Sequence, residues 1–168
     1  MVLTQNSNNI LIINSVFEFV KNISEVSNSF VKNGVNKNEV PLFRGQPDVE
    51  YKLLPSIGRD RTSKFSITIF NEERNLIDTC KYKMPDVFTN NLSPIELLAL
   101  LQHHGIPTRL LDVTENALVA LYFACCDKLD KDGEVFVFKH NEIDITNYPL
   151  IEAIADSYRF TKKALYAL

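Results

Sequence analysis

The sequence contains few glycines, prolines and cysteines, and each shortage excludes a class of protein. Five glycines and seven prolines in 168 residues exclude a collagen-like or low-complexity chain. The three cysteines are Cys80, Cys125 and Cys126. An odd number with two adjacent is a poor basis for disulfides and indicates reduced thiols. Reduced thiols favour a cytoplasmic protein. We expect the adjacent pair to fill the core, because it lies in an apolar run and free cysteines are commonly buried.

Positive charge is not in excess, and long hydrophobic runs are absent. Lysine and arginine number 18 against 21 acidic residues, so the formal net charge is −3. Nucleic-acid-binding proteins usually carry a basic excess or stripe, so a nucleic-acid partner is not expected. The apolar stretch 10–13 is too short for a signal peptide or a membrane span, and no positively charged segment precedes it. We therefore expect no membrane partner.

The chain does contain enough hydrophobic residues for one packed domain. Of its residues 45% are hydrophobic and 23% are charged, and a chain of this length buries about two-thirds of its unfolded surface. Apolar residues at spacings of three and four predict helices, and short apolar runs between turn residues predict strands. The predicted helices cover 15–33, 66–82, 93–105, 115–126 and a weaker pattern from 151 onward. The predicted strands cover 40–46, 109–114 and 134–139.

These elements alternate loosely along the chain, which favours the α+β class with a small mixed sheet packed against helices. The helix at 115–126 is apolar almost all round, so we expect it to be buried. We divide the chain into an N-terminal helical arm at 1–36, a core at 37–140 and a C-terminal segment at 141–168.

The segment 101–114 carries the greatest variety of chemical groups in the chain. It holds the amide of Gln102, the imidazoles of His103 and His104, the guanidinium of Arg109 and the carboxylate of Asp112. Adjacent histidines do not face one another on a helix or strand, and no zinc-binding spacing is present, so we expect no metal. A nucleophile elbow and the common glycine-rich phosphate loops are also missing.

Arg44 followed by Gly45 is the second candidate for chemistry. An arginine at the end of a strand, next to a glycine that permits close approach, can present its guanidinium to a phosphate or carboxylate. The structural alternative is a buried ion pair with Asp112, since an unpaired carboxylate within an apolar strand is costly. Arg109 is the other possible partner of that carboxylate.

Several of these motifs together resemble the FRG domain family, which takes its name from the triplet Phe43-Arg44-Gly45. The resemblance also rests on 53–59 (Leu-Leu-Pro-Ser-Ile-Gly-Arg), on the long motif at 101–114 and on the apolar run 117–124. It covers about 40–138. FRG domains occur mainly in bacterial and phage proteins, and their biochemical role is poorly defined. The resemblance implies that 141–168 is truncated or degenerate, because FRG domains tend to continue into a segment with Arg and Gln.

A more distant similarity is to the Arg–Ser–Glu ADP-ribosyltransferases, which implies a transferase-like core that uses NAD. On this similarity Arg44 resembles the arginine that grips NAD, and Thr114 stands where that family has its Ser/Thr motif. The family's late glutamate has no recognisable counterpart among Glu115, Glu134, Glu142 and Glu152. The similarity implies catalytic roles for Arg44, Thr114 and His103, and NAD binding by Arg44, Gly45, Gln102, Arg109 and Asp112.

Two functions from different classes follow. The first is an NAD-binding, ADP-ribosyltransferase-like or NAD-cleaving effector in bacterial or phage conflict (a toxin or a phage-defence protein), with a nucleotide ligand and a protein acceptor. The second is a non-catalytic module that binds a ligand or a protein, in which the polar residues form a structural network and His103 satisfies a buried backbone group. A nuclease is disfavoured by the acidic charge and by the lack of metal ligands.

Overall fold

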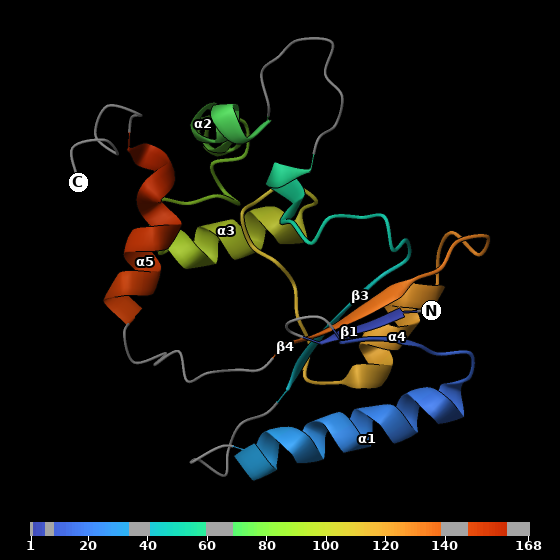
Figure 1. Cartoon of the computed structure of the whole chain (residues 1–168). Coiled ribbons are helices and arrows are strands. Elements are labelled where there is room, and N and C mark those ends of the chain that lie inside the picture. The colour runs from blue at the N-terminus through green and yellow to red at the C-terminus, as the bar shows by residue number, and fades with distance from the viewer. Residues whose placement is uncertain (1, 6–8, 34–40, 60–68, 139–147, 161–168) are drawn as a thin grey trace. The chain divides into compact units, whose positions relative to one another are not determined.

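The computed structural model describes residues 2–5, 9–33, 41–59, 69–138 and 148–160 (Figure 1). Within this part of the chain the fold is α+β. Its strands are β1 (Val2–Gln5), β2 (Asn9–Ile12), β3 (Leu42–Gln46) and β4 (Glu134–Phe138). Its α-helices are α1 (Val16–Asn33), α2 (Glu73–Lys83), α3 (Pro94–His103), α4 (Ala117–Cys125) and α5 (Tyr148–Asp156). Short 3-10 helices are η1 (Ser56–Gly58), η2 (Ile69–Glu72) and η3 (Ser157–Arg159).

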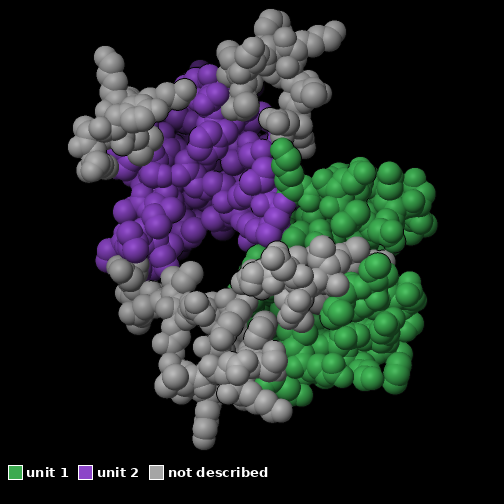
Figure 2. Space-filling view, in the orientation of Figure 1, with its two compact units in different colours: residues 1–52, 112–143 green, residues 53–111, 144–168 purple. Residues whose placement is uncertain are grey.

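The chain forms two compact units, each built from two separate stretches of sequence (Figure 2). Unit 1 consists of 1–52 and 112–143 and contains the four strands with α1 and α4. Unit 2 consists of 53–111 and 144–168 and contains α2, α3 and α5. The division into an arm, a core and a C-terminal segment stays a prediction, and the two units follow different boundaries.

Unit 1 is built on a mixed sheet with the strand order β2-β1-β4-β3. The strand β1 runs parallel to β4, whereas β3 runs antiparallel to it with Phe43 opposite Val137. The strands β3 and β4 lie where the sequence predicts them. The strands β1 and β2 were not predicted, because the segment 1–36 shows a helical pattern only from Ser15 onward.

The core of unit 1 lies between one face of the sheet and the helices α1 and α4. Ser15 caps α1 by accepting a hydrogen bond from the backbone N–H of Glu18 (3.1 Å), as its position before the helical pattern predicts. The buried apolar side chains come from both helices, from the preceding turn and from the two adjacent strands: Ile13, Phe19, Val26, Phe43, Ala120, Ala124, Val135 and Val137.

The expectation that α4 is buried all round is wrong. Ala120 and Ala124 face the sheet and are buried, but Tyr122 is 64% exposed and Phe123 is 53% exposed. Helix α4 therefore packs against the core of unit 1 along one side, where Ala117 and Leu121 are partly buried next to the two alanines. The expectation that the adjacent cysteines fill the core is also wrong, since Cys125 and Cys126 are exposed. Burial raises the pKa of the third cysteine, the half-buried Cys80.

Unit 2 is a cluster of helices with a core of its own. The motif Ser93-Pro94-Ile95-Glu96 starts α3 with a capping box, as the sequence predicts. The backbone N–H of Ile95 also donates to the carboxylate of Glu152 on α5 (3.2 Å). The buried apolar residues are Ile77, Phe88, Leu97, Leu98, Leu101, Ala155 and Tyr158.

The predicted strand at 109–114 is wrong. This segment has no regular strand, and only Thr114 forms an isolated antiparallel bridge, with Phe43. The apolar residues Leu110 and Leu111 suggested a strand, but Leu110 packs on the core of unit 2. Two of its backbone groups bond to side chains: the N–H of Leu110 donates to the hydroxyl of Thr108 (3.2 Å), and the oxygen of Asp112 accepts from Arg44 (2.7 Å).

Candidate functional site

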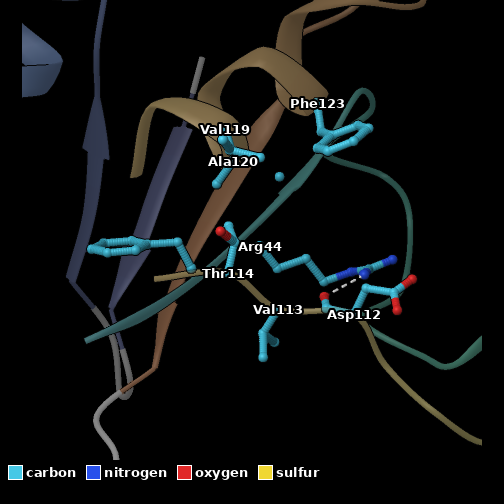
Figure 3. A pocket seen from close by; sticks show the side chains of 9 residues that line it. Arg44, Asp112, Val113, Thr114, Val119, Ala120 and Phe123 are labelled. Atoms are coloured by element: carbon cyan, nitrogen blue, oxygen red, sulfur yellow. Dashed lines mark hydrogen bonds between the residues drawn. The ribbon is translucent and has the colours of Figure 1, made fainter. Parts of the chain in front are cut away.

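Unit 1 contains a cleft of about 310 Å³ beside the outer edge of β3 (Figure 3). This strand is the last in the sheet, so one of its edges is not covered by another strand. The lining side chains come from β3, from the segment before α4 and from α4 itself: Phe43, Arg44, Gly45, Asp112, Val113, Thr114, Val119, Ala120 and Phe123. The cleft thus has largely apolar walls with one guanidinium and one carboxylate.

Gly45 allows α4 to approach β3 closely and form one wall of the cleft. A Cβ atom at this position would lie 1.8 Å from the backbone oxygen of Ala120 and 2.8 Å from the backbone nitrogen of Ala124. Gly133, just before β4, is under the same constraint from Ala124. Gly45 therefore lines the cleft through the close approach of a helix, and its predicted part in cofactor binding stays a prediction.

Arg44 lies at the point where the segment 112–114 separates from β3. Phe43 and Thr114 exchange two backbone hydrogen bonds, of 2.7 and 2.8 Å, so this pair is strand-like. Two residues further along β3, the pairing would bring Gly45 opposite Asp112. There the Nη1 atom of Arg44 donates to the backbone oxygen of Asp112 (2.7 Å). The carbonyl of Asp112, which would accept a backbone hydrogen bond if the strand pairing continued, thus accepts one from a side chain instead. The cleft opens at this point.

Thr114 contributes to the local structure at the start of α4. Its hydroxyl oxygen accepts a hydrogen bond from the backbone N–H of Asn116 (3.1 Å). The side chain of Asn116 in turn caps α4 by accepting from the N–H groups of Leu118 and Val119. The predicted site residues Arg44, Gly45, Asp112 and Thr114 therefore line one cleft, and Thr114 is held there by the cap of α4.

Gln102, His103 and Arg109 belong to unit 2, and the structure does not place the two units relative to each other. Whether these residues reach the cleft of unit 1 therefore stays a prediction. His103 is exposed and its ring contacts that of His104 edge to face. Among the described residues, no group of three or more metal-binding side chains is present.

Arg109 holds the elements of unit 2 together. Two nitrogens of its guanidinium donate to the carboxylate of Glu73, and the Nε–Oε1 distance is 2.9 Å. The side chain of Glu73 is 5% exposed. It also donates to the hydroxyl of Ser157 in η3. Arg109 thus joins α2 to η3 within unit 2.

Gln102 and Thr108 form a second polar network inside unit 2. Thr108 is 1% exposed, and its hydroxyl donates to the amide oxygen of Gln102. Its backbone N–H donates to the hydroxyl of Ser56 (3.0 Å), and its backbone oxygen accepts from Ile57 (3.1 Å). The two motifs 53–59 and 101–114 are therefore joined by hydrogen bonds. Both motifs could be recognised in the sequence, but the hydrogen bonds between them could not be predicted from it.

A third polar cluster, which lies in unit 1, was not predicted from the sequence. The ammonium of Lys128 lies 3.0 Å from the carboxylate of Asp48 and 4.2 Å from the ring centre of Tyr51. A hydrogen bond from the backbone of Glu50 lowers the pKa of Asp48, and Lys128 lowers it further. Tyr51 first, and then Asp48, raises the pKa of Lys128, so this ion pair is charged at neutral pH. It fixes the loop after β3 against the turn before β4.

Four glutamates were considered as counterparts of the late glutamate of the ADP-ribosyltransferases, and two of them make hydrogen bonds within the fold. Glu134 is 8% exposed and lies 3.5 Å from the amide nitrogen of Gln46. Glu152 caps α3 within unit 2. Glu115 is exposed, and Glu142 lies outside the described residues. The acidic residue that lines the cleft is Asp112.

Comparison with known proteins gives one match. The family model described as the FRG domain matches residues 39–133, which is more than half of the chain. No curated protein and no solved structure matches this chain. None of the helices in the described ranges has the length and apolar character needed to cross a membrane.

Proposed function

The chain belongs to the FRG domain family, and we propose that it binds NAD in the cleft of unit 1, with Arg44 holding the pyrophosphate. The observation that carries this proposal is a guanidinium among the lining residues of an otherwise largely apolar cleft of about 310 Å³. Planar guanidinium groups bind phosphate oxygens through paired hydrogen bonds. The apolar walls formed by Val113, Val119 and Phe123 suit the flat rings of a dinucleotide.

The chemistry proposed for this site is cleavage of the bond between nicotinamide and ribose. Nicotinamide leaves with the bonding electron pair, and positive charge develops on the ribose. Water or an acceptor side chain then adds to the same carbon and releases a proton to solvent. A carboxylate close to that carbon stabilises the charge, and Asp112 is the acidic side chain of this cleft. Transfer to a protein acceptor, and a role in bacterial or phage conflict, are the wider form of this proposal.

Titration calorimetry with NAD tests the proposal. We expect saturable binding, and Arg44→Ala should weaken it by roughly tenfold to a hundredfold, the value of a charge-assisted hydrogen bond. The matched control is Lys21→Ala, which removes one positive charge from an exposed position on α1 and should leave the affinity unchanged. An absence of NAD binding by the unmodified protein would remove the proposal.

The second candidate is a non-catalytic binding module, and one specific observation favours it. Gln102, Thr108 and Arg109 are engaged in hydrogen bonds and an ion pair within unit 2, as a structural network requires. The two candidates differ in nicotinamide release. If NAD binds and no nicotinamide appears over many hours, the module is the better description. If nicotinamide is released, and Asp112→Asn abolishes this release without weakening NAD binding, the enzyme is the better description.

A further inference from the structure

Unit 1 exposes apolar side chains on two of its helices, α1 and α4. Six of them, which we call the α1–α4 patch, come from the first turns of α1 and the outer side of α4: Val16, Phe17, Val20, Leu118, Tyr122 and Cys125. Phe17 projects furthest and is 81% exposed. Soluble monomers rarely expose adjoining apolar side chains over more than a few hundred Å², and larger patches mark interaction sites.

The two halves of the α1–α4 patch form one surface. Val16 on α1 and Cys125 on α4 line the same open hollow, of about 320 Å³, between the two helices. Each of the other four members lies three or four residues from another member on its own helix, and side chains at these spacings are neighbours. All six belong to unit 1. The patch is therefore continuous across the hollow.

The composition and the area of the α1–α4 patch fit a protein partner. The residues of α4 from Ala117 to Cys125 include no charged side chain, and the centres of interfaces are depleted in charge and enriched in aromatic residues. With about 200 Å² for an aromatic side chain and about 150 Å² for a smaller one, the exposed fractions give roughly 600 Å² of apolar surface. A stable interface buries about 800 Å² on each partner, of which roughly 500 Å² is apolar.

We propose that the α1–α4 patch is the contact surface of a homodimer, so that its partner is a second copy of this chain. Phe17 follows Val16 directly, so a projecting aromatic side chain lies next to the hollow. An apolar cavity of about 150 Å³ holds a benzene ring, and the hollow of about 320 Å³ has room for a phenyl group.

The patch carries both the projecting group and the hollow that receives it. A two-fold dimer uses the same surface on both copies, so Phe17 of each copy enters the hollow of the other. This pairing buries both phenyl groups and leaves neither hollow open. The patch is thus complementary to itself, which favours a second copy over a different protein.

Sedimentation velocity across protein concentrations from low micromolar to submillimolar tests the proposal. We expect the mass to rise from that of one chain to that of two. Phe17→Gln should weaken the dimer by on the order of a hundredfold, because two phenyl groups leave the interface. The matched control is Tyr82→Gln, which removes an aromatic side chain that is 87% exposed on α2 and should leave the dimer unchanged. Melting temperatures show that both variants are folded.

The two exposed cysteines report where the contact lies. Cys125 belongs to the patch, whereas Cys126 does not line the hollow. As the protein concentration rises, iodoacetamide should modify Cys125 more slowly relative to Cys126, as measured by peptide mass spectrometry. In Phe17→Gln this ratio should stay constant over the concentrations at which the variant is a single chain.

Three results would overturn the proposal. The first is a single chain at every concentration, and the second is a dimer that Phe17→Gln leaves intact. The third is a ratio of Cys125 to Cys126 modification that does not change as the dimer forms, since another surface then makes the contact. No NAD is present in these experiments, so their outcome is independent of the function proposed for Arg44.

Discussion

Gly45 shows how one residue sets the position of a helix in this fold. Its missing side chain lets the backbone of Ala120 come so close that an added Cβ would lie 1.8 Å from the carbonyl oxygen. We therefore predict that Gly45→Ala destabilises the protein by about 2 kcal/mol, because the backbone of α4 must move. Urea unfolding followed by circular dichroism measures the change.

Gly58→Ala is the matched control for that substitution. The nearest atom to an added Cβ at Gly58 is the Cβ of Leu54, at an ordinary contact distance of 3.9 Å. Its unfolding midpoint should therefore stay close to that of the unmodified protein. Similar losses for both alanine variants would show that the close approach of α4 is not what Gly45 provides.

Arg109 is a second residue whose role the structure defines more sharply than the sequence. Replacing it by methionine leaves the carboxylate of Glu73, whose side chain is 5% exposed, without its cation. We predict a loss of about 3 kcal/mol of unfolding free energy, as expected when one member of a buried ion pair is removed.

Arg74→Met tests whether that loss comes from burial. Arg74 pairs with Asp78 on the exposed side of α2, with both side chains more than half exposed. Exposed pairs contribute little, so this variant should lose less than about 1 kcal/mol. If the two methionine variants unfold at the same urea concentration, the Arg109–Glu73 pair is not a structural link.

At the scale of elements, the residue patterns predicted where helices lie better than which of their faces are buried. The motif at 93–96 predicted the start of α3 because capping is a local property of four residues. The burial of α4 could not be predicted, since its apolar residues look alike in sequence and only packing decides which face the sheet. The same limit applies to 109–114, where the partner of the Asp112 carbonyl is the side chain of Arg44.

The contact between α5 and α3 makes the stability of unit 2 depend on pH. A hydrogen bond from Tyr148 lowers the pKa of Glu152 most, with help from the backbone of Ile95 and from Ser93. A carboxyl group with a lowered pKa in the folded state stabilises the protein fully above its ordinary value of 4.5. That contribution is lost as the pH falls through the folded-state pKa.

Glu152→Gln should therefore weaken the dependence of the unfolding free energy on pH at acidic pH. We expect the variant to be less stable than the unmodified protein at neutral pH, and the difference to shrink below pH 4.5 as the native carboxyl group is protonated. Urea midpoints measured across this range provide the test. Curves that stay parallel down to strongly acidic pH would contradict the role of Glu152 as a charged cap of α3.

At the scale of the whole molecule, the chain builds two units from alternating stretches of sequence. The family match at 39–133 spans parts of both units. A linear division could not predict this arrangement, because β1 pairs with β4 across more than a hundred residues. The cleft depends on the same long-range assembly, since β3 and α4 form it together. Four residues that the sequence singled out for their chemistry, Arg44, Gly45, Asp112 and Thr114, line the cleft together, and their roles there stay predictions.

The most direct test of the proposed function is to map NAD onto the backbone by NMR. Amide signals of uniformly labelled protein are recorded as NAD is added. We predict that signals from 43–45, 112–114 and 119–123, the segments that contain the cleft residues, shift together and saturate. Arg44→Ala should suppress these shifts. If no signals shift, or if the shifted signals lie outside these segments, the cleft of unit 1 is not an NAD site.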